Sequence, residues 1–239
     1  MNVSVVIPAH NEERFLPRCL DSVRKASDVF GEVVEIVVVC NRCSDRTESI
    51  ARSYGCRTLT DDSRSLAHIR NRGVAAAAGE IVLTIDADSW MTPGLIREAV
   101  EKLRSGRYVG GGVRIYPERV SLGIVCSLLV VAPFVVFRGV SYGLFWFRKS
   151  DFDLIGGFDE SLVSAEDVNF ALRLKALGKK TGRGYGTIRR NYIWTSCRKF
   201  DRFGDWYLAR NPRLVATLIS GRNRDAADGF YYDSGKTKS

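Results

Sequence analysis

Short apolar runs alternate with amphipathic stretches through the first half of the chain. Residues 3–7 and 81–85 are almost wholly apolar, and residues 35–39 become so after Glu35. Runs of this length with no polar face are typical of strands that are buried on both sides of a parallel sheet. The pattern therefore predicts an α/β fold with a doubly wound, mostly parallel central sheet flanked by helices. The expected strands are residues 3–7, 35–39, 57–60 and 81–85.

The second half of the chain is less regular, and its most unusual feature is residues 120–137, which contain no charged side chain. Eighteen residues is about the shortest length that crosses a bilayer as a helix. Because Gly123 and Pro133 interrupt the stretch, we expect a buried or interfacial segment instead. Around it the pattern predicts helices at residues 93–103 and 166–177 and strands at residues 108–115 and 142–147.

Composition and charge narrow the class of protein. Apolar residues make up 45% of the 239 residues and charged residues 26%, a balance typical of a folded globular chain. The net charge is +9, and residues 198–224 carry seven basic side chains against two acidic ones. Such a cluster attracts phosphate-rich partners or serves as a solvated face, and charge alone leaves both open. Six cysteines in a chain of this length indicate reduced thiols.

Asp86-Ala87-Asp88, an Asp-x-Asp (DxD) motif, is a candidate for chemistry because it directly follows an apolar strand. Ligands of doubly wound sheets bind beyond the carboxyl ends of the strands. Side chains alternate along an extended backbone, so Asp86 and Asp88 reach the same side. One carboxylate can hold a sugar or ribose hydroxyl while the other binds Mg²⁺ or Mn²⁺. Diphosphate and water then complete the coordination shell of the ion. A solvated turn gives the same letters.

Glu166-Asp167 opens a predicted helix that ends at Gly178. Acidic residues in a first helical turn are favoured by the helix dipole, so the pair has a purely structural explanation. In a functional role, a carboxylate near the reacting carbon of a sugar accepts the proton of an incoming hydroxyl. The pair by itself leaves both explanations open.

The turn Pro8-Ala9-His10-Asn11-Glu12 ends the first predicted strand. Exposed backbone and the carboxylate of Glu12 can grip the base and ribose of a nucleotide there. The alternative explanation is that Asn11 caps the helix that follows.

Taken together, these segments resemble the inverting family 2 glycosyltransferases of the GT-A fold. The resemblance extends over residues 3–198 and rests on the order of six motifs rather than on any one of them. The motifs are Val-Val-Ile-Pro-Ala-His-Asn-Glu-Glu (5–13), Ser-Asp-Arg-Thr (44–47), Arg-Asn-Arg-Gly (70–73) with Ala78-Gly79-Glu80, Asp86-Ala87-Asp88, Gly156-Gly157-Phe158-Asp159 and Glu166-Asp167.

The resemblance implies a metal-dependent, inverting transfer of a sugar from a nucleotide-diphosphate sugar to an acceptor hydroxyl. Asp167 is the implied general base, supported by Glu166, and Asp88 is the implied main ligand of Mn²⁺ or Mg²⁺. Asp86 is expected to contact the ribose or the metal, and Arg70 the phosphates or sugar of the donor. The other expected substrate-binding residues are Pro8, Ala9, Asn11, Glu12, Asn41 and Ala87.

Two departures from the family pattern affect the expected ligands. Many members carry two acidic residues after the second strand, where this chain has Cys40 and Asn41, so the preferred nucleotide stays open. Some relatives add a histidine ligand to the metal, whereas this chain has only His10 and His68. We therefore expect weak metal binding until the donor is present.

The division of labour along the chain is also an expectation. A single domain at residues 1–230 is predicted, with a nucleotide-sugar-binding half at 1–115 and an acceptor-binding half at 116–230, and residues 231–239 as a flexible tail. Residues 120–137 with Phe145, Trp146 and the basic stretch from Arg198 are hypothesised to face a membrane or a lipid-linked acceptor. The amino terminus shows no signal-type stretch, which predicts a cytoplasmic protein. Peripheral membrane contact follows from the hypothesised face, and no nucleic acid partner is expected.

Two other classes of protein remain as alternatives. Cys40 and Cys43 form a C-x-x-C pair between a strand and a helix, the placement used by thiol-disulfide oxidoreductases. That class leaves the acidic motifs unexplained. A non-catalytic nucleotide-sugar-binding module or a nucleotidyltransferase is the other alternative, but Asp167 argues for a catalytic role and no Gly- and Lys-rich phosphate loop is present.

Overall fold

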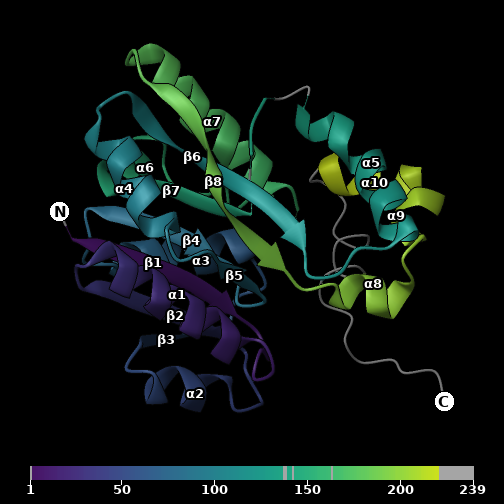
Figure 1. The fold of residues 1–239 in the computed structure, drawn as a ribbon, viewed down its shortest axis with the longest axis horizontal. Helices are drawn as coiled ribbons and strands as arrows, with labels where there is room; N and C mark the ends of the chain where they lie inside the picture. The colour runs from purple at the N-terminus through teal and green to yellow at the C-terminus, as the bar shows by residue number, and fades with distance from the viewer. Residues whose placement is uncertain (1, 137–138, 142, 163, 221–239) are drawn as a thin grey trace.

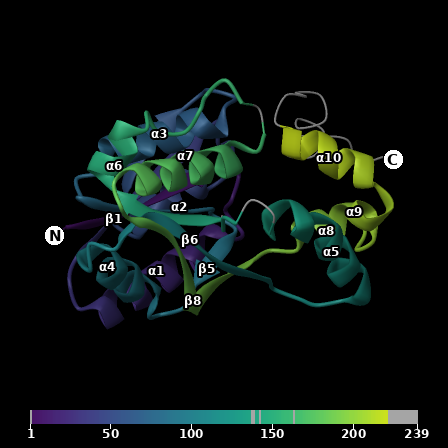
Figure 2. The same cartoon turned by 90° about the horizontal axis from the view of Figure 1, so that it is seen from above.

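The structure, a computed structural model, describes residues 2–136, 139–141, 143–162 and 164–220. A twisted central sheet has helices on both faces, and a group of short helices lies to one side of it (Figures 1 and 2). The sheet has eight strands in the order β3-β2-β1-β4-β7-β6-β8-β5. The predicted α/β architecture is therefore confirmed.

The strands of the first half are parallel, and the second half adds antiparallel neighbours. β1 pairs in parallel with β2 and β4, β2 with β3, and β6 with β8. β7 is antiparallel to both β4 and β6, and β5 is antiparallel to β8. The strands are β1 Val3–Ala9, β2 Val34–Asn41, β3 Arg57–Asp61, β4 Ile81–Ile85, β5 Ser89–Met91, β6 Tyr108–Pro117, β7 Leu144–Arg148 and β8 Gly184–Thr195.

Alternate side chains of the central strands fill two separate hydrophobic cores. In β7, Trp146 belongs to one core, while Phe145 and Phe147 belong to the other. In β1, Val5 and Ile7 lie on the Trp146 side and Val6 on the opposite side. This alternation follows from the two-residue period of a strand and explains why both β1 and β4 are almost wholly apolar.

The helices α1, α2 and α4 cover the face of the sheet that carries Trp146, and α3, α6 and α7 cover the opposite face. Gly73 allows α3 to lie close to the sheet, because a Cβ atom there would fall 2.3 Å from Val6 Cγ1. The helices of the two layers are α1 Leu16–Phe30, α2 Thr47–Ser53, α3 Leu66–Ala76, α4 Leu95–Arg104, α6 Lys149–Leu154 and α7 Glu166–Lys180.

One longer helix and three short ones at the side of the sheet form what we call the C-terminal helical group. Its members are α5 Leu122–Val136, α8 Arg198–Phe203, α9 Tyr207–Arg210 and α10 Pro212–Ser220. Ile124 and Ser127 turn the inner side of α5 toward α9, where Ser127 Oγ accepts a hydrogen bond from the backbone N–H of Ala209. Among the described residues, no helix is both long and apolar enough to cross a bilayer.

Some expectations about the second half need correction. Phe145 and Trp146 do not face a membrane, because they are 1% and 0% exposed inside the two cores. The strands β5 and β8 and the helices α8, α9 and α10 were not predicted. Residues 231–239 lie outside the described part of the chain, so the predicted tail is untested.

Candidate active site

Arg70 joins the two acidic motifs that lie 80 residues apart in the sequence. Its side chain is 3% exposed, because α3 packs tightly against β1 and carries the guanidinium to the carboxyl edge of the sheet. Nη2 donates to Asp86 Oδ1 at 2.8 Å, while Nη1 donates to Glu166 Oε1 at 3.0 Å and to Asp167 Oδ1 at 2.5 Å. The end of β4 and the start of α7 are therefore joined by one guanidinium.

The environment of Asp167 suits a group that takes up a proton near neutral pH. Burial raises the pKa of its carboxyl, the cation of Arg70 opposes this rise, and the neighbouring carboxylates of Glu166 and Asp86 add to it. The side chain keeps 22% of its surface exposed, so an acceptor can reach it. A raised pKa matches a general base to the working pH better than an ordinary aspartate does.

Backbone strain among the described residues is concentrated in turns beside the candidate motifs. Three residues other than glycine have a positive φ: Asn11 (54°), Arg42 (45°) and Ala165 (58°). Each lies in a turn beside a candidate motif, after β1, after β2 and before α7 respectively. Left-handed backbone costs energy for a residue with a Cβ atom and is enriched at binding sites.

A second ion-pair cluster lies beside the first and includes a residue from the C-terminal helical group. Arg198, at the start of α8, donates from Nη1 to Glu12 Oε1 at 2.6 Å, and its Nε lies 3.1 Å from Asp88 Oδ2. Ser196 Oγ donates to the same oxygen of Asp88 at 2.9 Å. The DxD motif is thus contacted by arginines from both halves of the chain.

Glu12 is a buried carboxyl with unmet hydrogen-bonding capacity. The residue is 6% exposed, and its Oε2 atom has no hydrogen-bond partner among the described residues. Burial raises the pKa of Glu12 to about 7, although the adjacent Arg198 opposes the shift. A buried oxygen without a partner is costly, so this atom marks a place where a ligand is expected.

The turn after β1 is fixed by contacts to the turn after β2. Asn11 Oδ1 accepts a hydrogen bond from Ser44 N–H at 2.8 Å, and His10 Nδ1 lies 2.7 Å from the carbonyl oxygen of Asn41. The alternative that Asn11 caps α1 is wrong, since the N-cap residue is Phe15 and no side chain caps the helix. The remaining expected substrate-binding residues, Pro8, Ala9 and Ala87, are buried.

Asn41 is held by the end of β3. Its Nδ2 donates to the carbonyl oxygens of Asp61 at 2.9 Å and Ser63 at 2.8 Å, and the residue is 1% exposed. Asp61 also accepts from Arg72 at 2.7 Å. The amide nitrogen of Asn41 is thus already used to join β2 to β3, with Asp61 as its main partner, and the expected contact of Asn41 with the substrate stays a prediction.

The Cys40 and Cys43 thiols lie within hydrogen-bonding distance of each other. This bond lowers the pKa of the Cys43 thiol and, together with burial, raises that of Cys40. Cys40 is 0% exposed, so one member of the pair is closed to a protein disulfide or to glutathione. The pair lies at the end of β2 and in the loop before α2, not in the first turn of a helix whose dipole would stabilise a thiolate, so the oxidoreductase alternative is weak.

The residues fit a divalent cation only in part. Among the described residues, no three His, Cys, Asp or Glu side chains lie close enough to form a metal site. Asp88 supplies hard carboxylate oxygens at a partly exposed position, and Glu12 Oε2 is an acceptor without a partner. A cation held here must therefore obtain most of its ligands from a bound diphosphate and from water, which Mg²⁺ and Mn²⁺ tolerate.

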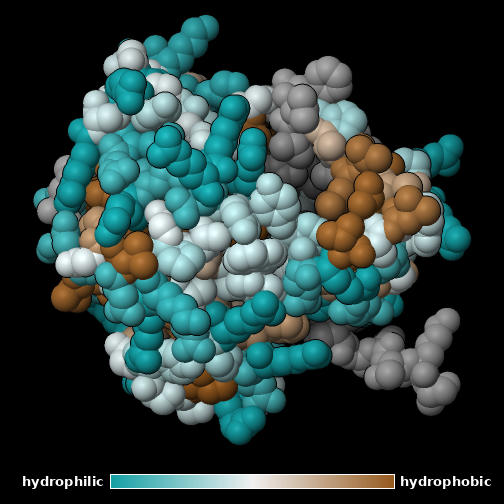
Figure 3. Space-filling view, in the orientation of Figure 1, coloured by the Kyte–Doolittle hydropathy of each residue, from teal (hydrophilic) through white to brown (hydrophobic). Residues whose placement is uncertain are grey.

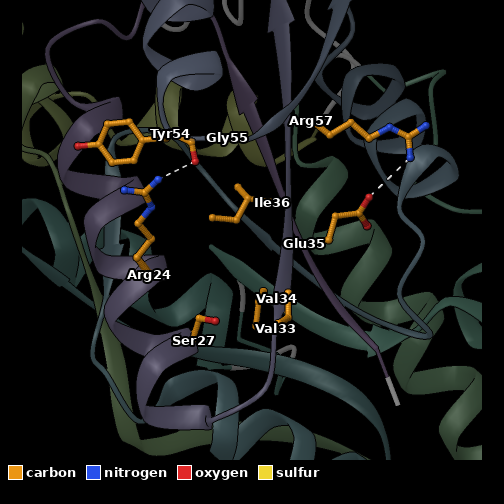
Figure 4. A pocket seen from close by; sticks show the side chains of 9 residues that line it. All are labelled: Arg24, Ser27, Val33, Val34, Glu35, Ile36, Tyr54, Gly55 and Arg57. Atoms are coloured by element: carbon orange, nitrogen blue, oxygen red, sulfur yellow. Dashed lines mark hydrogen bonds and ion pairs between the residues drawn. The ribbon is translucent and has the colours of Figure 1, made fainter.

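A separate hollow of about 370 Å³ lies far from these carboxylates (Figure 4). It is formed by the end of α1, the starts of β2 and β3, and the residues after α2. Arg24 and Arg57 line it, and each is already bonded, to the carbonyl oxygen of Tyr54 and to Glu35 respectively. Because it opens at the amino ends of the parallel strands, it is not where doubly wound sheets bind ligands.

Comparison with known proteins identifies the family. The sequence model of glycosyl transferase family 2 matches residues 4–155, which is more than half of the chain. The chain therefore belongs to this family, and its architecture is the expected GT-A fold.

Curated relatives are longer than this chain. The putative glycosyltransferase EpsH of Bacillus subtilis (strain 168) is 29% identical over 96 residues, which cover 38% of this chain and 27% of EpsH. The undecaprenyl-phosphate 4-deoxy-4-formamido-L-arabinose transferase of Pseudomonas aeruginosa (strain LESB58) is 34% identical over 122 residues, covering 47% of this chain and 35% of that protein. The chain thus matches about a third of the length of these relatives.

Solved structures share the fold over nearly the whole chain. Residues 1–349 of TarS from S. aureus match with a TM-score of 0.64 at 19% identity, covering 96% of this chain and 69% of that chain. Glucosyl-3-phosphoglycerate synthase from Mycobacterium tuberculosis, crystallised with Mn²⁺, UDP and phosphoglyceric acid, matches with a TM-score of 0.62 at 19% identity, covering 93% and 79%.

Proposed function

We propose that this chain transfers a sugar from a nucleotide-diphosphate donor to an acceptor hydroxyl with inversion at the anomeric carbon. The observation that carries the proposal is the contact of Arg70 with Asp86 on one side and with Asp167 on the other. It brings a candidate donor-binding carboxylate and a candidate base to the same guanidinium. Family membership supports the reaction class, and the TarS complex with UDP-GlcNAc supports a nucleotide-sugar donor.

In this mechanism Asp167 takes the proton of the acceptor hydroxyl. The oxygen freed of its proton forms a bond to the anomeric carbon from one face, while the bond from that carbon to the diphosphate breaks on the other face. Glu166 shares Arg70 with Asp167 and keeps the base oriented. Arg70, buried between three carboxylates, holds Asp86 and the base in place in this proposal, and its expected contact with the donor stays a prediction.

A divalent cation is part of the proposal because the site is too acidic for a diphosphate alone. The side chains of the two ion-pair clusters comprise five carboxyl groups and two guanidinium groups, namely Glu12, Asp86, Asp88, Glu166 and Asp167 against Arg70 and Arg198. Asp88 would hold the cation, which would neutralise the charge that develops on the departing diphosphate. The Mycobacterium tuberculosis neighbour with Mn²⁺ and UDP supports this assignment.

We place the acceptor on the side of the C-terminal helical group and propose that it is lipid-linked. The outer side of α5 exposes Leu122, Val125, Leu128 and Leu129, which are 72%, 39%, 41% and 64% exposed. Brown atoms gather in Figure 3 where Figure 1 draws α5. An exposed apolar face on a helix without charges suits a membrane surface, and the undecaprenyl-phosphate transferase relative supports a lipid-linked acceptor.

The direct test of the proposed function is a thermal-shift screen of nucleotide-diphosphate sugars with and without Mn²⁺. A donor is expected to raise the melting temperature strongly only when Mn²⁺ is present, because binding to the native state stabilises it by mass action. If no nucleotide-diphosphate sugar changes the melting temperature under either condition, the transferase assignment is wrong. A full shift in the presence of a chelator contradicts the role of the cation alone.

A further inference from the structure

Arg198 is a site residue that the sequence motifs did not assign. It lies 110 residues beyond Asp88, at the point where the chain leaves β8 and enters α8 (Figure 1). The backbone of this segment is fixed against the DxD motif, since Ser196 N–H donates to the carbonyl oxygen of Asp88 at 3.0 Å. The guanidinium of Arg198 is thereby presented to both Asp88 and Glu12.

In the structure Arg198 provides the positive charge that these two carboxylates need. It contacts Glu12 at 2.6 Å and Asp88 at 3.1 Å, with 42% of its own side chain exposed, whereas the two acids are 7% and 14% exposed. The acids are thus fixed and mostly buried, while the long arginine side chain enters from the solvent side. It is the member of the cluster that can leave without unpacking the core.

A divalent cation cannot bind Asp88 while Arg198 stays in its present position. Asp88 Oδ2 already lies 3.1 Å from Arg198 Nε and accepts a hydrogen bond from Ser196 Oγ. A Mg²⁺ or Mn²⁺ ion binds a carboxylate oxygen at about 2.1 Å, so it would lie within a few ångströms of the guanidinium. Two cations that close repel each other strongly in a partly buried site.

We infer that Arg198 is a resident cation that is exchanged for the divalent ion when the donor binds. The donor brings the cation to Asp88 and offers diphosphate oxygens to which Arg198 can turn, so the arginine loses one anionic partner and gains another. The unpartnered Glu12 Oε2 fits this exchange, because the acid keeps acceptor capacity for the ligand. This inference rests on the proposed function, whose donor supplies the diphosphate.

The exchange predicts that Arg198 weakens binding of the cation alone and strengthens binding of the cation together with the nucleotide. Without nucleotide, Arg198 competes with the cation. With nucleotide, Arg198 binds the diphosphate, so the cation and the nucleotide strengthen each other. Binding linkage is reciprocal, so one coupling factor describes both directions.

The experiment is a titration of the full chain with Mn²⁺, followed by the electron paramagnetic resonance signal of the free ion, with and without UDP. Arg198→Ala is expected to bind Mn²⁺ alone more tightly than the wild type, on the order of tenfold, and to show weaker UDP binding in the presence of Mn²⁺. Arg198→Lys keeps the charge and is expected to stay near the wild type for Mn²⁺ alone. Arg202→Ala, an exposed arginine of the same helix, is the matched control.

Mn²⁺ affinity in Arg198→Ala that is unchanged or weaker than in the wild type overturns the exchange, whatever UDP does. The proposed function fails separately, if UDP and nucleotide-diphosphate sugars do not bind the wild type with or without Mn²⁺. Circular dichroism spectra and melting temperatures of the three variants establish that the comparison is between folded proteins.

Discussion

Arg70 and Arg198 divide the carboxylates of the site between them. Arg70 is buried and holds Asp86, Glu166 and Asp167, whereas Arg198 is half exposed and holds Glu12 and Asp88. A buried arginine with three partners keeps these carboxylates in fixed positions, because removal of one member from such a network leaves a buried charge uncompensated. An exposed arginine is free to move. The two residues thus have the same chemistry but different expected roles.

Glu12 leads to a prediction about stability and pH. Its pKa is about 7 in the folded chain against 4.5 for an ordinary glutamate, so the native state binds its proton more tightly. Between these pH values the native state holds more protons than the unfolded state, and the contribution of Glu12 to the free energy of unfolding falls as pH rises. Glu12→Gln removes this loss.

The variant is therefore expected to gain stability relative to the wild type as pH rises from 5 to 8, on the order of 2 kcal/mol. Urea denaturation at the two pH values in chelator-treated buffer measures it. If the free energies of unfolding of the two proteins differ by the same amount at both pH values, the raised pKa of buried Glu12 is contradicted.

At the scale of secondary structure, the sequence predicts best where an element is long and patterned. The strands β1, β2, β4 and β6 and the helix α7 are close to their expected positions. β5 has only three residues, and β8 contains Arg189, Arg190 and Asn191, so neither shows an apolar run. Both are strands because of their neighbours in the sheet, which is a tertiary effect that a local pattern does not contain.

The helix α5 leads to a prediction about membranes. Leu122→Ser and Leu129→Ser, combined in one variant, remove two side chains that are 72% and 64% exposed. Folding should change little, because neither is in a core. Binding to vesicles of mixed neutral and anionic lipids is expected to weaken by on the order of tenfold, since each side chain would otherwise be buried in the interface. Co-sedimentation measures the partition.

Leu154→Ser is the control, because Leu154 is equally exposed at 72% but ends α6 on the sheet domain. Equal vesicle binding by wild type and both variants contradicts membrane contact through α5. If the wild type forms a stable dimer and does not bind vesicles, and the double variant is a monomer, the same face binds a second copy of the chain instead.

At the scale of the whole molecule, the candidate site lies where the sheet meets the C-terminal helical group. Strands from both predicted halves share one sheet, since β7 lies between β4 and β6. The division at residue 115 into donor-binding and acceptor-binding halves remains a prediction. The contact of Arg198 with Glu12 joins residues 186 positions apart and links the helical group to the turn after β1.

The sequence identified the acidic motifs but not their partners. Asp86, Asp88, Glu166 and Asp167 follow or precede regular elements, where spacing and family resemblance mark them. Arg198 was visible only as part of a basic cluster, because nothing local shows which acid a distant arginine meets. The amide of Asn41 also joins β2 to β3, a contact between strands that no local pattern shows.

The most direct test of the central claim is a comparison of donor affinity and turnover in Asp167→Asn. Asparagine keeps the shape, and Arg70 keeps Asp86 and Glu166 as partners. With Mn²⁺ present, the dissociation constant of the donor is expected to stay within about threefold of the wild type, while sugar transfer falls by about 10³-fold because the base is lost. Normal turnover with weakened donor binding would contradict the assignment of donor and base to opposite sides of one cavity.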